Sequence, residues 1–386
     1  MSVDDHRIDV SAAAAVYERA DRIDVGPDGD LVEVERDDVR LRPRRQPADV
    51  VSAERLRRIQ FGKEVTPGTA VAATTRWRGT GVLKDLREVD EHEEDVGILG
   101  GTDRTAIVAY KGGIDLAAVP LTFEQFPYIL AMAFGGPTTG SADGVGTDKI
   151  YTTNVPTTAL PTLQTYTIEG GDNFEQEVLE YAYCTKFSIV GAPGKVNTIA
   201  ATLAGRQVQR LAGGFAAATL PTVENALFQK SKVYLDAIGG AYGTTPVANA
   251  ILGYKVDVEI PTVMKFTADG ALTFSFAQWV DYTIKGELTF EHDTAVSGQS
   301  GAKLDWRNQT PKLLQIKMEG ANVATGGTTY QKKTILINLP IKYKVADPLT
   351  DQSKNDTIKL QFRSRYNATA GNAGNFVVVN ELTALP

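Results

Sequence analysis

Three histidines and one cysteine are the residues best suited to acid–base or nucleophilic chemistry in this chain. His6, His92 and His292 lie far apart, and none has a Cys or a second His at the spacing of a metal site. Cys184 falls inside a strand pattern with no histidine near it in sequence, which predicts a small core residue. The sequence also lacks phosphate-loop, dinucleotide-binding, zinc-protease and serine-hydrolase motifs. We therefore predict that the protein is not an enzyme and that it uses no cofactor or metal.

The acidic run Asp90–Asp95 is the stretch whose composition best suits a hard cation. Consecutive carboxylates repel one another and converge on an ion only where a turn holds them, so a solvated acidic loop is the favoured interpretation. Glycine pairs such as Gly112–Gly113 are not followed by a helix with Lys and Ser or Thr, so they predict turns or bulges. A hydrolase built on an unrecognised pair of carboxylates is the least favoured alternative.

The composition is that of an ordinary soluble folded protein. Of 386 residues, 42% are hydrophobic and 23% are charged, and this length has room for two domains. The formal net charge of −7 argues against a surface that grips nucleic acid. No apolar run approaches the length of a membrane span, and the start MSVDDHRIDV lacks the apolar core of a secretory signal. We therefore expect synthesis and folding in a cytoplasm.

Residues 1–58 differ from the rest of the chain. They contain 11 Arg and no Lys, and prolines interrupt their arginine-rich part. We predict an N-terminal extension or arm here, with a short helix around Ala12–Ala20 and a hairpin around Asp24–Val34. The sequence leaves open whether this arm lies on a partner or is a disordered extension that follows an early start of translation.

The most apolar segment of the chain, Leu121–Phe134, predicts a helix. Thr122 and Gln125 have the spacing of a capping box, whereas Pro127 fits only near a first turn, so the helix begins at Phe123 or at Phe126. Because its apolar side chains surround most of the circumference, we expect it to pack both on its own sheet and against a neighbouring subunit. The residues assigned to that interface are Phe123, Phe126, Ile129 and Met132.

Most of the remaining chain predicts antiparallel β-strands. A hairpin is predicted where Val178–Val190 and Val196–Arg206 flank the turn Gly191–Gly194. The order of elements in 59–230 resembles that in 231–386, so we predict two antiparallel β-sandwich or barrel modules, related by tandem duplication, with one flanking helix. Alternation with period two is clearest in four further stretches: Tyr254–Ile260, Leu272–Phe276, Tyr282–Phe290 and Leu314–Met318. Thr334–Val345 and Ile358–Tyr366 predict a long pair of strands joined by a polar loop.

Five stretches give the chain a resemblance to the major tail tube proteins of long-tailed, siphovirus-like bacteriophages. Their order and spacing carry the resemblance, because each stretch alone is a weak motif. Together they cover residues 59–236, and the second half is similar more loosely, through its strands and the ending Phe376–Leu382. The five stretches are Ile59–Thr75, Glu93–Gly101, Leu121–Phe134, Tyr181–Val208 and Leu220–Asp236.

This resemblance implies a self-assembling structural protein of a phage tail or of a related particle. Subunits of that family form rings whose inner sheets join into one β-barrel, and the rings stack into a tube. The tube conducts double-stranded DNA without binding it specifically and houses a tape-measure protein, and tail terminator and tip proteins are further partners. A chain with two modules implies a trimeric, pseudo-hexameric ring, whereas one decorated module implies a hexamer. The expected location is the virion, after assembly in the host bacterial cytoplasm.

The resemblance also assigns two sets of surface residues. The loop 84–104 is expected to reach across a ring interface, with contacts from Asp90, Glu91, Glu93, Glu94, Asp95, Ile98 and Leu99. Acidic side chains on the second-half strands either line the channel, where they would repel the DNA backbone, or face solvent; they are Asp257, Glu259, Glu287 and Glu291. The alternative function is a β-sandwich binding or adhesin module. It requires exposed aromatic residues, and we expect its candidates Trp77, Trp279 and Trp306 in cores or interfaces instead.

Overall fold

The computed structural model describes residues 24–25, 31–32, 56–100, 102–247, 250–292, 301–352 and 355–386. The chain divides into two compact units, Met1–Val51 and Ser52–Pro386. In the first unit, β1 (Asp24–Val25) pairs antiparallel with β2 (Leu31–Val32), as the predicted hairpin requires. The helix expected around Ala12–Ala20 lies outside the described residues.

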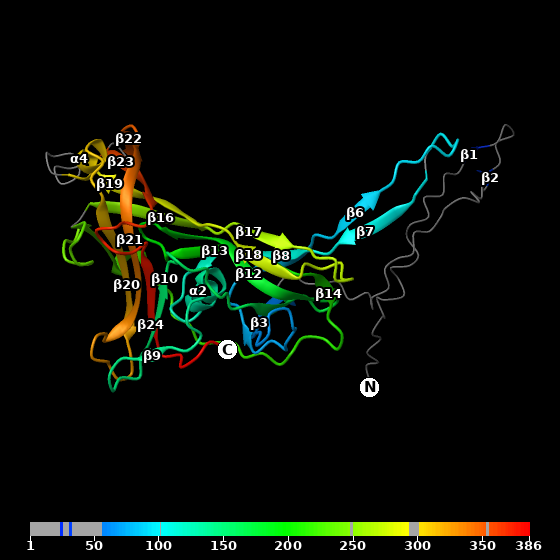
Figure 1. Ribbon diagram of the computed structural model, residues 1–386, viewed down its shortest axis with the longest axis horizontal. Helices are drawn as coiled ribbons and strands as arrows, with labels where there is room; N and C mark the ends of the chain where they lie inside the picture. Colours follow the sequence, from blue (N-terminus) through cyan, green and yellow to red (C-terminus); the bar gives the residue numbers. More distant parts are fainter. Residues whose placement is uncertain are drawn as a thin grey trace, which may run out of the picture. The chain divides into compact units, whose positions relative to one another are not determined.

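Antiparallel strands dominate the second unit, which confirms the mainly-β prediction (Figure 1). The first half contains β3 (Arg58–Lys63), β4 (Thr75–Arg76), β5 (Gly81–Asp85), β6 (Glu88–Glu91), β7 (Thr105–Ala109), β8 (Gly112–Pro120), α2 (Phe126–Phe134), β9 (Ser141–Ala142), β10 (Lys149–Asn154), β11 (Tyr166–Gly171), β12 (Gln176–Gly191), β13 (Thr198–Gly205), β14 (Val208–Arg210) and the 3-10 turn η2 (Phe228–Lys230). The second half contains β15 (Ser231–Ala237), β16 (Ile251–Glu259), β17 (Thr262–Lys265), β18 (Phe276–Trp279), β19 (Thr283–Glu291), α4 (Ala302–Arg307), β20 (Lys312–Asn322), β21 (Lys332–Ala346), β22 (Thr350–Gln352), β23 (Asn355–Ser364) and β24 (Asn375–Asn380).

Eight strands form a continuous antiparallel sheet in the order β5-β8-β13-β12-β16-β19-β23-β21, which we call the eight-stranded sheet. Its register places Phe187, Val258 and Ile284 side by side, and all three side chains are buried. Successive residues of a strand point to opposite faces, so Asp257 and Lys285 lie together on the other face. The sheet therefore has one apolar face toward the core and one polar face.

The eight-stranded sheet consists of two four-stranded halves with the same order of elements. In each half a two-stranded hairpin, β6–β7 or β17–β18, connects the first strand to the second, and a helix, α2 or α4, follows the second strand. This repetition is the order expected of a tandem duplication. The two halves nevertheless belong to one compact unit, because β12 pairs with β16 and β10 pairs with β24, so residue 230 does not separate two bodies.

Helix α2 begins at the later of the two predicted positions. Phe126 is its first residue, Pro127 lies in the first turn, and Gly135 ends the helix in the left-handed conformation with φ 67°. Thr122 caps the preceding turn rather than the helix, because its Oγ1 accepts the N–H of Gln125 at 3.3 Å. All nine helical residues are buried.

Both halves of the same chain cover α2, which packs on β12, β10 and β24. The ring of Phe126 lies 6.2 Å from that of Phe187 on β12 and 6.3 Å from that of Phe376 on β24. The second half therefore supplies the additional cover that the sequence assigned to a neighbouring subunit. The interface prediction for this helix is wrong, because its four residues are core residues that are at most 1% exposed: Phe123, Phe126, Ile129 and Met132.

Candidate assembly surfaces

The polar face of the eight-stranded sheet is a mosaic of ion pairs. Glu259 accepts a hydrogen bond from Lys285, which lowers the pKa of the carboxyl and raises the pKa of the amine. Pairs this exposed contribute roughly 0.2–1 kcal/mol each, so their main effect is to neutralise the face. The N···O separations are 2.9 Å for Lys255–Asp257, 3.5 Å for Lys186–Glu259, 2.9 Å for Lys285–Glu259 and 3.4 Å for Lys359–Glu287.

The strand register brings all four predicted channel acids to this polar face, together with a larger number of basic residues. The face is mixed in charge rather than acidic, because the strand register adds lysines from other strands that the pattern of the second half alone does not place there. The acids are Asp115, Asp257, Glu259, Glu287 and Glu291. The basic residues are Lys84, Lys186, Lys255, Lys285, Lys342, Lys359 and Arg363.

The eight-stranded sheet begins at β5, whose outer edge pairs with no other strand in the described part of the chain. On its inner side, Ala117 donates its N–H to the carbonyl of Thr80, and Leu86 donates its N–H to Lys111. Hydrogen-bonded positions alternate along an antiparallel pair, so even-numbered residues of β5 bond to β8. The N–H and C=O groups of Gly81, Leu83 and Asp85 therefore point outward.

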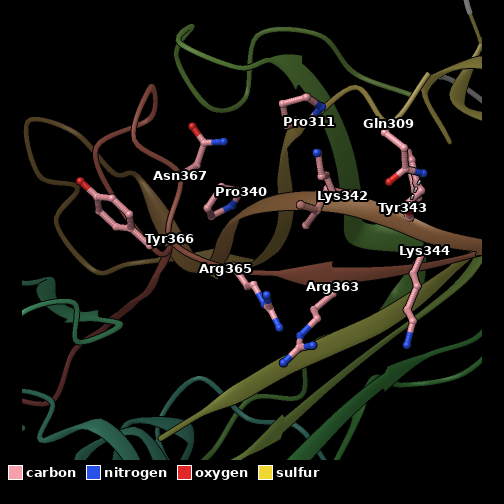
Figure 2. A pocket seen from close by; sticks show the side chains of 11 residues that line it. Gln309, Pro311, Pro340, Lys342, Tyr343, Lys344, Arg363, Arg365, Tyr366 and Asn367 are labelled. Carbon is pink, nitrogen blue, oxygen red and sulfur yellow. Dashed lines mark hydrogen bonds between the residues drawn. The ribbon is translucent and has the colours of Figure 1, made fainter. Parts of the chain in front are cut away.

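The sheet ends at the C-terminal part of β21, where residues 342–346 pair only with β23 among the described strands. The carbonyl of Tyr343 accepts a 3.3 Å bond from Gln309 Nε2, and that of Lys344 accepts a 3.3 Å bond from Trp306 Nε1. These two side-chain hydrogen bonds take the place of main-chain bonds from a neighbouring strand. A hollow of about 290 Å³ borders this edge (Figure 2), and its charged lining residues are all basic: Lys342, Lys344, Arg363 and Arg365.

The hairpin β6–β7 is a second unpartnered surface, because among the described strands each of its two strands pairs only with the other (Figure 1). An isolated two-stranded hairpin is marginally stable in water, and exposed apolar side chains gathered on one mark a contact site. Glu94 is held within the loop by Arg104 and Thr102, whereas Asp90, Glu91, Glu93 and Asp95 are exposed. The exposed apolar residues, with exposed fractions up to 110% at Leu99, are Val89, Val96, Ile98, Leu99, Ile107 and Val108.

The corresponding hairpin of the second half, β17–β18, is covered by the first half of the chain. The ring of Phe274, in the loop between its strands, lies 5.1 Å from that of Tyr181. Arg206 Nε donates to the carbonyl of Phe274 at 3.1 Å, and Tyr110 forms a β-bridge with Thr273. The β17–β18 hairpin is thus packed because the first half of the chain lies beside it. The β6–β7 hairpin has no such neighbour in the described chain.

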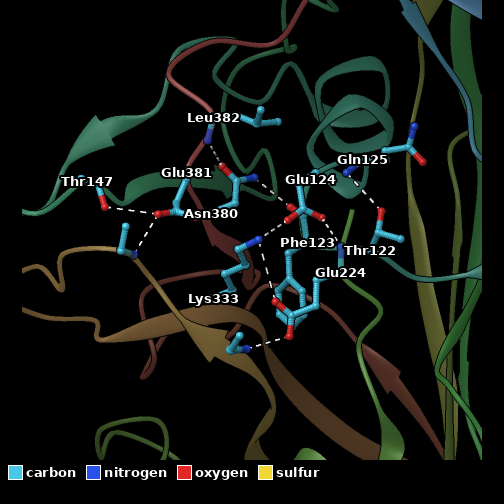
Figure 3. Close-up of polar contacts among 12 residues, drawn as sticks. Thr122, Phe123, Glu124, Gln125, Thr147, Glu224, Lys333, Asn380, Glu381 and Leu382 are labelled. Carbon is cyan, nitrogen blue, oxygen red and sulfur yellow. Dashed lines mark hydrogen bonds and ion pairs between the residues drawn. The ribbon is translucent and has the colours of Figure 1, made fainter. Parts of the chain in front are cut away.

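A buried polar network fixes the two halves to each other near the start of α2 (Figure 3). Lys333 Nζ lies 2.7 Å from Glu124 Oε1 and 3.8 Å from Glu224 Oε2, and the N–H of Glu224 donates to Glu124 at 2.8 Å. Asn380 Nδ2 donates to the carbonyl of Phe123 at 2.8 Å. Sequence analysis missed this network because its partners lie 100, 209 and 257 residues apart.

The described residues hold no group of three or more His, Cys, Asp or Glu side chains placed to bind a metal ion. Trp77 and Trp279 are 6% and 8% exposed, and Trp306 is half-buried, so none forms the exposed platform that an adhesin needs. Across the described helices, none combines the length and the apolar character needed to cross a membrane.

Comparison with known proteins finds similarity among solved structures alone. No protein-family model and no curated protein matches the chain. Among the solved structures that match is the SPP1 tail tube, a hybrid structure from solid-state NMR and cryo-electron microscopy. Its sequence is 12% identical, the TM-score is 0.29, and the match covers 41% of this chain and 81% of the tail-tube chain. A TM-score of this size does not establish a shared fold.

Proposed function

We propose that this protein is a structural subunit that closes into rings and that the rings stack into the tube of a phage tail. The observation that carries ring formation is the join between β12 and β16 inside the chain, together with the free edges of β5 and β21. The internal join shows how two halves pair: β12, the last strand of the first half in the sheet, pairs with β16, the first strand of the second half. Pairing β21 of one copy with β5 of another repeats it. The assignment of the ring to a phage tail rests on the sequence resemblance.

The internal join also supplies the register of the proposed contact. Matching the halves strand by strand makes Tyr343 the equivalent of Phe187, and Leu83 the equivalent of Val258. Phe187 lies opposite Val258 in the internal join. Tyr343 of one copy is therefore placed opposite Leu83 of the next, both on the core side, with Lys342 opposite Lys84 on the polar side.

Closure of the ring would remove both exposed sheet edges, which are otherwise sites of uncontrolled pairing. Three copies bring six four-stranded halves, so we favour a trimeric, pseudo-hexameric ring, with a hexamer as the alternative. The polar face lines the channel in this arrangement because α2 and the core side chains lie against the other face. Its mixed charges suit passage of double-stranded DNA and a tape-measure protein without specific binding. Virion location follows from the same proposal, as do contacts with terminator and tip proteins.

A mixed disulfide experiment tests the ring contact. One variant carries Lys342→Cys and the other carries Lys84→Cys, and the two are mixed under oxidising conditions. The proposed pair is non-hydrogen-bonded, with Cα atoms about 4.5 Å apart, inside the range for disulfides. We expect a cross-linked dimer only in the mixture. Native Cys184 will not compete, because it is fully buried and burial raises its pKa to about 12.

The internal control for this experiment is the double variant Lys186→Cys, Glu259→Cys. These residues face each other in the join between β12 and β16, so the disulfide forms within one chain. The proposal fails if the control pair is oxidised while the mixture is not. It also fails if the purified protein stays monomeric at high concentration and shows no rings by electron microscopy.

The exposed hairpin is proposed to join successive rings. The double variant Ile98→Asp, Leu99→Asp should form rings that do not stack, because two charges replace apolar side chains that are 65% and 110% exposed in the single chain. Side views by electron microscopy measure the length of the stacks. Val65→Asp is the matched control, since Val65 is 91% exposed on another loop. Tubes of normal length from the double variant would exclude this hairpin from the stacking contact.

A further inference from the structure

Two buried carboxyl groups, Asp143 and Asp148, meet where a loop of the first half contacts a loop of the second. Asp143 is 4% exposed and Asp148 is 0% exposed. A Cβ atom on Gly327 would lie 2.4 Å from Cγ of Asp143. A Cβ atom on Gly146 would lie 2.2 Å from Oδ1 of Asp148 and 2.6 Å from Cα of Gly327. The two carboxyl groups therefore border the same pair of glycines, and the proposed ring contact uses neither of them.

The two carboxyl groups differ sharply in their hydrogen bonds. Both oxygens of Asp143 accept the N–H of Thr329 at 2.9 Å, and Oδ2 also accepts the N–H of Tyr330 at 2.7 Å. Neither oxygen of Asp148 has a donor among the described residues. A buried carboxylate without donors is strongly unfavourable, whereas a neutral carboxylic acid has an O–H to donate.

We propose that Asp143 and Asp148 share one proton, with Asp148 as a neutral acid that donates its O–H to ionised Asp143. The bond clasps the loop before β10 to the loop between β20 and β21. Main-chain contacts already hold these loops together: Thr147 donates its N–H to the carbonyl of Thr325 at 2.9 Å, and the N–H of Thr325 donates to Oγ1 of Thr147 at 3.1 Å. The clasp therefore joins the two halves of the chain through a group that titrates.

The pKa shifts of the two groups agree with this geometry. Burial raises the pKa of Asp148, and the nearby main-chain amide of Asp148 itself opposes this rise. The charge of Asp143 and the hydrogen bond to it raise the pKa further. Burial opposes the shift at Asp143, but the N–H groups of Tyr330 and Thr329 outweigh it and lower the pKa of that carboxyl. The neutral form of Asp148 therefore stabilises the fold at low pH. This contribution is lost as the pH rises from the ordinary Asp value of about 4 through the raised pKa of Asp148.

Four other titratable groups surround the pair. Lys149 Nζ donates to the main-chain carbonyl of Asp148 at 3.3 Å, and its charge opposes the rise in that pKa. Glu381 accepts the Thr147 hydroxyl at 3.3 Å, on the first-half side of the clasp. Tyr330, in the second loop, interacts with Asp143 and with Lys317. None of them donates a hydrogen bond to the carboxyl group of Asp148. That carboxyl group therefore forms its hydrogen bond by donating its own proton to Asp143.

The test compares Asp148→Asn with Asp143→Asn in the full chain, by melting temperature from about pH 4 to about pH 9. An amide at 148 can donate to Asp143 at every pH, so the Tm of Asp148→Asn relative to wild type should rise as the pH rises. Asp143→Asn should lower Tm throughout, because an amide places a donor against the N–H groups of Thr329 and Tyr330. The expected result is this asymmetry.

Two results would overturn the shared proton. One is a Tm difference between wild type and Asp148→Asn that stays constant with pH. The other is equal loss of Tm in both variants, with a decrease in wild-type Tm on adding EDTA and recovery on adding Ca²⁺ or Mg²⁺. The second result would identify the pair as cation ligands, since carboxylates brought together in a protein hold either a proton or a cation between them.

Discussion

Asp85→Pro leaves the chain folded but abolishes ring formation, whereas Asp85→Ala assembles like the wild type. The N–H of Asp85 points to the free edge of β5, so its loss removes no bond to β8. Its equivalent in the internal join is Ile260, whose N–H donates to the carbonyl of Thr185 on β12 at 2.8 Å. A proline at position 85 has no main-chain N–H to donate, and its ring lies at the outer edge of β5. Natural proteins use proline in the same way to block a strand edge. Size-exclusion chromatography with light scattering, followed by electron microscopy, measures assembly.

Comparison of the two variants isolates the main-chain donor. Both lose the Asp85 carboxylate, whose hydrogen-bond partner is the neighbouring Arg87. Both should unfold within about 1 kcal/mol of wild type, as expected for an exposed position. Normal rings from the proline variant would mean that β5 is not the contact strand. Failure of both variants would place the effect in the carboxylate rather than in strand pairing.

The strand pattern was predictable where one face of a strand is buried and the other is not. Alternating side chains located β16 and β19, in which buried and half-buried residues alternate along most of the strand. The same reasoning failed at Leu272–Phe276, where the strand is instead β18, Phe276–Trp279. Phe274 is buried because its ring packs on the first half of the chain, not because it alternates within a strand.

The free edges were not predictable, because strand pairing joins main-chain groups that every residue carries. Nothing in the side chains of Gly81–Asp85 distinguishes a strand with one partner from a strand with two. Buried acids were missed for a related reason: their partners lie far away in sequence. Glu64 is 2% exposed and accepts the hydroxyls of Thr165 and Thr167 and the N–H of Tyr181. In sequence it stands in a polar turn and looks like a surface residue.

Helix α2 shows what amphipathicity can and cannot establish. A helix that is apolar nearly all round must be covered on more than one side, and the structure buries all nine residues of α2. Its pattern contains no information on whether the cover comes from the same chain or from another copy. Here Phe376, located 250 residues after Phe126, provides it. A test for assembly residues must therefore use side chains that remain exposed in the single chain.

Phe126→Asp should consequently prevent folding, not merely assembly. Removing the ring from a fully packed core costs about 3–5 kcal/mol, and an unpaired buried charge adds several more. That sum approaches the whole stability of a typical domain, about 5–15 kcal/mol. We expect insoluble expression, or soluble protein that lacks near-ultraviolet circular dichroism. Urea unfolding of any soluble fraction gives the remaining stability.

Leu99→Asp is the matched control, because it introduces the same charge at an apolar residue that is fully exposed in the single chain. It should fold with wild-type stability, so any defect it has arises in contacts between copies. Phe126→Leu should also fold, with a smaller loss of stability from the volume removed between Phe187 and Phe376. A soluble Phe126→Asp monomer with wild-type unfolding and no rings would contradict the structure. It would return α2 to the assembly interface, because only a helix face open to solvent can accept a charge without loss of stability.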